Sequence, residues 1–265
     1  MSESITAKYK DSYVAFLDVL GFKNMVIQED DVKLTTYFKE VKEVINELKN
    51  IESKKNIGNI IISDSIILTI EKDNNKERNV FLLRQLCIAV SKIQKKLALH
   101  DIWLRGAISC GKTYFDMFNN QIVGPAYINA YQLEEELAIY PRVIVDNKVI
   151  SDLNYDNSDD FIKGINDEGS RTEEIALYDW CKNRSITNLT IEQDVLFFID
   201  YLNDVINNPA DFTTIYNNIK KNLYSNTKIS KKFRWVINYL YTIALREEFS
   251  SIDEIHNIKD KLKKL

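Results

Sequence analysis

Two aspartates in similar strand-and-turn contexts are the residues of this chain whose type and spacing best suit metal chemistry. Asp18 ends the apolar run 13–17, and Asp64 lies in the turn of the apolar hairpin 60–68. If the two strands lie side by side, both carboxylates meet at one end of a sheet. Carboxylates bind hard divalent cations, and such ions bind the phosphates of a triphosphate. The sequence therefore predicts a metal site made by Asp18 and Asp64.

Each aspartate by itself also has a simpler interpretation. Asp18, three residues before Gly21, is of a type preferred as a helix cap. Ser63 and Asp64 are of types preferred in hairpin turns. Metal binding is favoured because the two aspartates occur together with further motifs, described below.

The elements that position these aspartates follow from apolar periodicity. The sequence predicts strands at 12–18, 57–63, 66–71, 102–109 and 142–146 and helices at 30–52, 78–99 and 125–139. This order predicts an α+β fold with a ferredoxin-like palm, in which helices back one sheet. We expect residues 1–153 to form this core.

Residues 154–265 do not continue the pattern of the core. Segment 154–191 is rich in Asn, Asp and Ser and is predicted to be an irregular insertion. Residues 192–265 are predicted to contain a returning strand at 195–199 and C-terminal helices, at about 210–225 and 228–249, that pack on the core.

Composition excludes several classes of function. The chain has 265 residues, 45% of them hydrophobic, and a net charge of −4 with dispersed Lys and Arg, which argues against a nucleic-acid groove. No apolar run approaches the ~18–20 residues needed to span a bilayer, so we expect no membrane segment. Three scattered cysteines and two histidines argue against a zinc site or a histidine-based triad and favour a cytoplasmic protein.

Four segments in order resemble the catalytic domain of class III nucleotidyl cyclases. The run Phe16–Phe22 is similar to the Phe-x-Asp-x-x-Gly-Phe opening of that family, and Ser63-Asp64 takes the place of its hairpin Gly-Asp. Residues 105–111 resemble its Arg-x-Gly-Ile-x-x-Gly strand, and residues 124–134 resemble its Gly-x-x-Val-Asn-x-Ala-x-Arg-Leu-Glu helix. The resemblance extends over about residues 12–146.

The resemblance implies a set of site residues and cofactors. Asp18, Asp64 and the backbone of Val19 would hold two Mg²⁺ or Mn²⁺ ions in each active site. The turn of Val19, Leu20, Gly21 and Phe22 would bind the phosphates, and the glycine permits its tight backbone. It also implies a homodimer whose sites lie at the interface.

The transition state needs a cationic donor. Arg105 is one candidate and Arg142 is another. A structural ion pair is the alternative for Arg105.

Several positions depart from the purine cyclases. Ile128 and Gln132 stand where those enzymes have the transition-state asparagine and arginine, and Ile60 and Gln121 stand at the base-reading positions. These departures disfavour adenylyl cyclase activity. A base-contact role for Ile60 and Gln121 rests only on their positions in the alignment with the purine cyclases. Tyr127 and Tyr131, four residues apart, either pack in the core or contact a base.

The chain looks more like the bacterial pyrimidine cyclases of Pycsar antiphage systems. That branch shares the segments 15–22, 105–108 and 130–134. The likeness implies UTP, or secondly CTP, as substrate and a cyclic pyrimidine mononucleotide that acts on a downstream effector. Two rival interpretations stay open: a non-catalytic cyclase-homology domain that binds nucleotide or a protein partner, and a palm-type polymerase.

Overall fold

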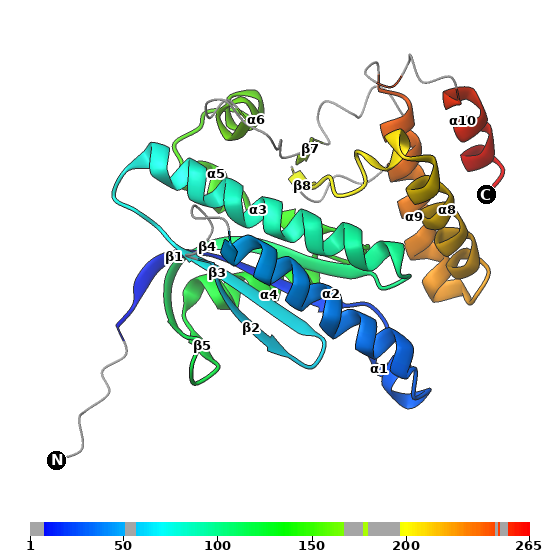
Figure 1. Ribbon diagram of the computed structural model, residues 1–265. Coiled ribbons are helices and arrows are strands. Elements are labelled where there is room, and N and C mark those ends of the chain that lie inside the picture. Colours follow the sequence, from blue (N-terminus) through cyan, green and yellow to red (C-terminus); the bar gives the residue numbers. More distant parts are fainter. Residues whose placement is uncertain (1–7, 51–56, 167–176, 180–196, 247–248, 250–253) are drawn as a thin grey trace.

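A mixed sheet of seven strands in the order β2-β3-β1-β4-β6-β8-β7 forms the centre of the molecule, with β5 paired to β4 (Figure 1). This computed structural model describes residues 8–50, 57–166, 177–179, 197–246, 249 and 254–265. The strands are β1 Lys10–Val19, β2 Gly58–Ile62, β3 Ser65–Glu71, β4 Leu104–Asp116, β5 Gln121–Val123, β6 Val143–Val145, β7 Leu177–Asp179 and β8 Phe197–Ile199.

The first four strands confirm the predicted α+β palm. Each neighbouring pair in the order β2-β3-β1-β4 is antiparallel, which is the arrangement of a ferredoxin-like core. The sheet then extends beyond β4, because β6 pairs parallel to β4 and β8 pairs antiparallel to β6. Strand β4 is longer than the predicted 102–109, since it continues to Asp116 and pairs there with β5.

Helices connect and cover these strands. Their bounds are α1 Phe22–Ile27, α2 Asp31–Asn50, α3 Lys76–Leu99, α4 Pro125–Glu136, α5 Asn147–Asp152, α6 Ser158–Asn166, the 3-10 turn η2 Val205–Asn207, α8 Pro209–Leu223, α9 Thr227–Ala244 and α10 Ile255–Lys263. Among the described residues, none of these helices has the length and apolar character needed to cross a bilayer.

The two faces of the sheet are covered by different helices, and this follows from the period of two along a strand. Tyr13 and Leu17 of β1 belong to the main core with residues of α2 and α3. Val14 and Phe16 point the other way, into a smaller cluster with Ala126 of α4. Asp18 continues this second alternation, so it lies on the α4 side of the sheet.

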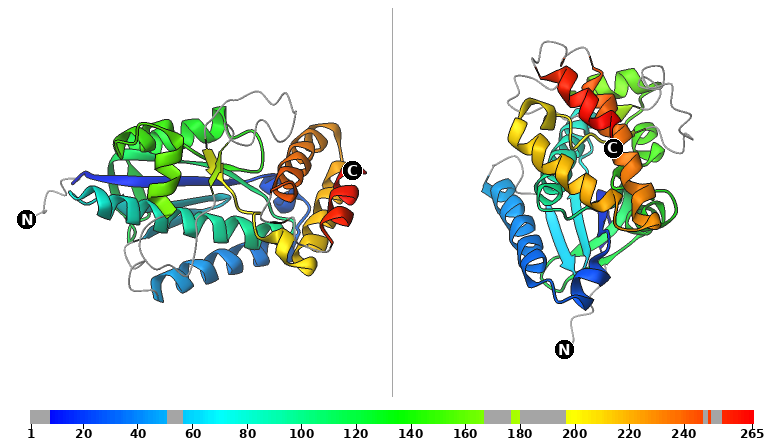
Figure 2. Two further views of the ribbon diagram at one scale, coloured as in Figure 1. Left: turned by 90° about the horizontal axis from the view of Figure 1, so that it is seen from above. Right: turned by 90° about the vertical axis from the view of Figure 1, so that its right-hand side faces the viewer.

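The helices α8, α9 and α10 gather at the end of the sheet opposite the beginning of β1 (Figure 2). This is the end at which β1 finishes with Asp18 and Val19. The C-terminal helices thus pack on the core, and Phe233, Val236 and Leu240 of α9 are buried.

Segment 154–191 is not wholly irregular, which corrects the expectation from its composition. Residues 158–166 form helix α6, and residues 177–179 form β7, which pairs with β8. Phe161 and Ile165 of α6 are fully buried. A few apolar anchors are enough to hold a polar segment in a helix, because burial of such side chains stabilises more than helix propensity does.

Candidate active site

The register between β1 and β3 brings the two predicted metal aspartates to the same end of the sheet. Asp18 pairs with Ser65, the residue directly after Asp64, across the antiparallel ladder. The backbone N–H of Val19 donates to the carbonyl oxygen of Asp64 at 3.1 Å. Ser63, in the hairpin turn, has a φ of 56°, a left-handed conformation that lets the turn be tight. The hairpin therefore closes against the C-terminal end of β1.

The charges of the two aspartates act on each other. Burial raises the pKa of the Asp18 carboxyl, Arg105 opposes this, and the neighbouring Asp64 carboxylate raises it further. Burial also raises the pKa of Tyr37 on α2, and both carboxylates add to that shift. Two carboxylates that repel each other at one strand end form a site that a divalent cation stabilises.

Arg105 lies between two carboxylates on the α4 side of the sheet. It is the direct partner of Asp18 in the β1–β4 ladder, and its Nε–H donates to Asp18 Oδ2 at 3.3 Å. The same Nε is 2.7 Å from Oε1 of Glu134 on α4. Arg105 thus forms the structural ion pair that was the alternative to a substrate role, and it stands beside the candidate metal site.

Glu134 is a member of the site that the sequence did not single out. Its side chain is only 4% exposed. Burial raises the pKa of its carboxyl to about 7, although Arg105 opposes the shift. The only signal in the sequence was its place in the Leu-Glu end of the helix motif, which carried no role by itself.

The turn after Asp18 has fewer available amides than a simple phosphate-binding turn. Leu20 N–H donates to Trp103 O at 2.8 Å, and the Val19 amide is already bonded to Asp64. Gly21 has a φ of 78°, the left-handed conformation that favours glycine. The Phe22 side chain packs on Tyr37. Among the four predicted turn residues, only the amides of Gly21 and Phe22 carry no hydrogen bond within the described part of the chain.

The predicted base-contact residues do not gather at this site within one chain. Ile60 is 1% exposed and belongs to the smaller cluster beneath α4, so its side chain is part of the core and does not read a base. Gln121 pairs with Asp116, eleven residues beyond Arg105 along β4. At about 3.3 Å per residue, that separation is roughly 35 Å.

Tyr127 and Tyr131 pack rather than line a cavity. Both rings make edge contacts with Phe16, with centroids 6.0 and 5.4 Å away. The outer part of Tyr131 is nevertheless exposed, since the residue is 42% accessible. Packing, the simpler of the two interpretations, accounts for the position of both tyrosines.

Arg142 does not reach the site, which corrects its place as a candidate for the cationic donor. It is 1% exposed. Its guanidinium carbon lies over the rings of Tyr140, Phe198 and Trp235 at 5.4–5.8 Å from their centroids. A cation enclosed by aromatic faces contributes to the core and is not available to a phosphate.

A lysine of the C-terminal helices, and not Arg142, lies beside the site. Lys232 of α9 is half-buried, and its charge acts on Asp18, Glu134 and Arg105. Burial and the Arg105 guanidinium lower its pKa, whereas the two carboxylates raise it. The sequence contained no signal for this, because a lysine on an amphipathic helix is most often solvated.

The donor set suits Mg²⁺ or Mn²⁺ in the presence of a nucleotide. Within the described residues there is no cluster of three or more His, Cys, Asp or Glu able to hold a metal ion. Mg²⁺ is commonly bound by one or two carboxylates together with substrate phosphates. Asp18 and Asp64 match that chemistry, and the phosphates of a substrate would complete the coordination.

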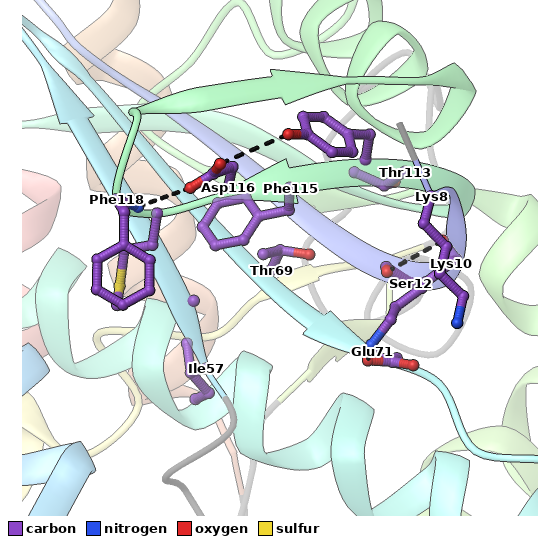
Figure 3. A pocket seen from close by; sticks show the side chains of 13 residues that line it. Lys8, Lys10, Ser12, Ile57, Thr69, Glu71, Thr113, Phe115, Asp116 and Phe118 are labelled. Atoms are coloured by element: carbon purple, nitrogen blue, oxygen red, sulfur yellow. Dashed lines mark hydrogen bonds and ion pairs between the residues drawn. The ribbon is translucent and has the colours of Figure 1, made fainter. Parts of the chain in front are cut away.

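A cavity of about 610 Å³ lies elsewhere, at the beginning of β1 (Figure 3). Its walls include Lys10, Ser12, Thr69 and Asp116, and Asp116 accepts hydrogen bonds from Tyr114 and from the backbone of Phe118. None of the predicted site residues lines it. The cavity therefore contributes nothing to the aspartate site.

Comparisons with known proteins return structures but no sequence family. No family model matches the chain, and no curated protein matches it. Among solved structures, the chain is similar to the adenylyl cyclase CyaB from P. aeruginosa, with 15% identity, a TM-score of 0.44 and coverage of 72% of this chain and 94% of that one.

Two further solved structures give similar values. The guanylyl cyclase Cya2 has 10% identity and a TM-score of 0.40, with 74% of this chain and 93% of that one covered. A bacterial light-regulated adenylyl cyclase has 13% identity and a TM-score of 0.39, with 81% and 98% covered. Identities and TM-scores this low do not indicate an activity, which must be argued from the residues of the site.

Proposed function

We propose that this protein is a metal-dependent nucleotide cyclase that converts a nucleoside triphosphate to its 3′,5′-cyclic monophosphate and pyrophosphate. The observation that carries the proposal is the β1–β3 register, which places Asp18 beside the Asp64 turn. The motif resemblance described above supports it independently, because the same two aspartates occupy the metal positions of class III cyclases.

The residues of the site suit an intramolecular phosphoryl transfer. The ribose 3′-hydroxyl loses its proton to solvent as its oxygen bonds to the α-phosphorus, and the bond from the α-phosphorus to the pyrophosphate oxygen breaks in line. Two bound Mg²⁺ or Mn²⁺ ions would supply a lower pKa of the 3′-hydroxyl and charge neutralisation of the triphosphate. Asp18, Asp64 and the backbone of Val19 would hold them. Arg105 orients the Asp18 carboxylate through its hydrogen bond and offers positive charge near the phosphoryl oxygens.

We propose a pyrimidine nucleotide as substrate, with UTP first and CTP second. The residues that read purines in adenylyl and guanylyl cyclases are absent, and Ile128 and Gln132, which replace two catalytic side chains, are both exposed on α4. The likeness to Pycsar cyclases supports a role of the cyclic product as an antiphage signal that a separate effector receives.

A homodimer is part of this proposal. Gln121 and the aspartate pair are too far apart in one chain to share a substrate, and a second chain could bring them together. Several apolar side chains are also exposed along the β2–β3 turn, the β4–β5 hairpin and α4: Ile62, Met117, Phe118, Val123, Ile128 and Tyr131. Burial of such a surface is a usual driving force for subunit association.

The rival function is a non-catalytic cyclase-homology domain that binds nucleotide or a protein partner. A structural observation favours it: Arg105 is paired with both Asp18 and Glu134, so its charge is already compensated. Loss of the asparagine and arginine of purine cyclases points the same way.

One experiment separates the two functions. The purified protein is incubated with each of the four ribonucleoside triphosphates and Mn²⁺, and the products are identified by mass spectrometry. We expect cyclic UMP in the largest amount and none from Asp64→Ala. Calorimetric binding of a triphosphate without any cyclic product would support the non-catalytic domain. Linear or cyclic oligonucleotides would indicate a palm polymerase.

A further inference from the structure

A cavity of about 360 Å³ adjoins the aspartate site and is closed on one side by the C-terminal helices. It lies between the turn after Asp18, the turn that precedes β4, and helices α8 and α9. Leu20 and Gly21 line it from the first turn, and Lys228 and Lys232 line it from α9. Neither lysine belonged to any predicted site.

The two lysines share one face of α9. They are four residues apart, which places their side chains one above the other along a helix. Both belong to the first two turns of α9, where the helix dipole is positive. Neither has an ion-pair partner within 4.0 Å among the described residues, whereas the charge of Lys232 is felt by Asp18 and Glu134. Lys232 therefore lines the cavity and also interacts with the carboxylates of the proposed metal site.

The acidic groups that also line the cavity are already committed to other partners. Asp101 accepts hydrogen bonds from Lys33 and Lys221, both at 2.9 Å. Asp30 uses Oδ1 to accept the backbone N–H of Lys33 at 3.1 Å, which caps α2. Lys33 is in turn held by the side chain and backbone of Asp101. Asp30 keeps its negative charge, and Lys33 and Asp101 are paired with each other, so Lys228 and Lys232 are the cations of the cavity lining without an ion-pair partner among the described residues.

We propose that this cavity binds the polyphosphate end of the nucleotide and that Lys228 and Lys232 are its cationic ligands. The inference rests on the proposed cyclase function, because it names the contacts of the same substrate. Lysine is a point-charge binder of phosphate, and two of them beside a metal pair suit the multiple charges of a triphosphate and of the pyrophosphate that leaves. The C-terminal helices then complete the site in the same chain, instead of only packing on it.

Binding of Mg²⁺-tripolyphosphate to the full chain tests the inference without requiring turnover. Isothermal titration calorimetry at low salt compares the wild type with Lys228→Met and Lys232→Met. We expect each substitution to weaken binding about tenfold, the effect of losing one charged hydrogen bond. Lys231→Met is the matched control, since Lys231 is exposed on α9 and does not line the cavity. It should bind as the wild type does.

The outcomes for the two proposals are distinguishable. If no triphosphate is cyclised but tripolyphosphate binding still depends on both lysines, the cyclase function fails and the phosphate site stands. If cyclisation occurs and both lysine variants keep the affinity and KM of Lys231→Met, the phosphate site is wrong. Uridine serves as a third probe: binding of uridine in place of tripolyphosphate would assign the cavity to the base and overturn the inference.

Discussion

Asp18 and Arg105 face each other across the antiparallel pair of β1 and β4, and the Arg105 Nε–H donates to Asp18 Oδ2 at 3.3 Å. The same guanidinium contacts Glu134 of α4. A carboxylate that is proposed to bind metal is thus held in place by a cation before any metal arrives. This pre-orientation reduces the ordering that metal and substrate binding must impose on the side chain.

The aspartate pair is the first target for substitution. We expect Asp18→Asn and Asp64→Asn each to lower the rate of cyclic nucleotide formation at least about a hundredfold, since each removes a charge that binds metal. Thermal unfolding should change little. Asp11→Asn is the control, because Asp11 is exposed at the other end of β1. Full activity of either variant would remove the substituted aspartate from the metal site.

The raised pKa of Glu134 leads us to expect that the stability of the metal-free protein depends on pH. Its pKa is raised to about 7 from an ordinary value of 4.5, so the folded state binds a proton that the unfolded state has released between these values. Its contribution to stability is therefore present at low pH and is lost as pH rises toward 7. Urea unfolding at pH 5 and pH 7.5 should show this slope, and the slope should be smaller in Glu134→Gln. Equal slopes in the two proteins would contradict the assignment.

Asp101 predicts a dependence of opposite sign. Hydrogen bonds from Lys221, Lys33 and Trp103 lower its pKa despite burial, so its contribution is present above its ordinary pKa and is lost as pH falls through the lowered value. Asp101→Asn should lower the free energy of unfolding at pH 7 by about 2–3 kcal/mol, since two lysines lose the negative charge of their buried acceptor. The backbone there has a φ of 58°, which Asn tolerates well.

A surface aspartate provides the control for that measurement. Asp204 pairs with Lys95, but its side chain is 56% exposed. Asp204→Asn should therefore cost less than about 1 kcal/mol at pH 7. If the two variants are equally stable, Asp101 does not fasten α8 to the sheet end.

Gly106 tests how closely β1 and β4 must approach. A methyl group at this position would overlap the carbonyl oxygen of Phe16, a backbone atom that cannot move alone. We expect Gly106→Ala to unfold the protein or to lower its melting temperature by more than about 10 °C, because the strand pair carrying Asp18 and Arg105 must separate. Gly21→Ala is the comparison: nothing lies within 4 Å of an added methyl there, so only backbone strain at its φ of 78° is added.

The proposed dimer predicts an effect of charge on the face of α4. Ile128 is 47% exposed, and we expect Ile128→Lys to shift the protein from dimer to monomer and to abolish cyclisation together with it. Sedimentation velocity measures the first effect and product formation the second. Tyr224→Lys is the control, because Tyr224 is 69% exposed at the end of α8. A wild type that sediments as a monomer while active would exclude a site shared between subunits.

The palm could be predicted because its signals are local. The apolar run of β1, the hairpin around Ser63-Asp64 and the helical spacing of α3 each depend on neighbours within a few residues. The observed bounds of these elements differ from the predicted ones by a few residues. The buried face of α2 is not evident from its sequence: Phe38 is 47% exposed, whereas Tyr37 and Val44 are fully buried. Aromatic and aliphatic residues at adjacent positions leave the helical phase ambiguous, and packing chooses between them.

The amino-acid sequence alone determined the element order, the palm topology and the two aspartates at strand and turn ends. Only the tertiary structure placed Glu134 and Lys232 beside them, buried Arg142 among aromatic rings, and separated Gln121 from the aspartate pair. The physical reason is the distance along the chain over which each kind of interaction acts. Periodicity and turn chemistry act between neighbours in the chain, whereas the position of a charge depends on which helix packs on which end of the sheet, and that is decided by the burial of the whole apolar surface.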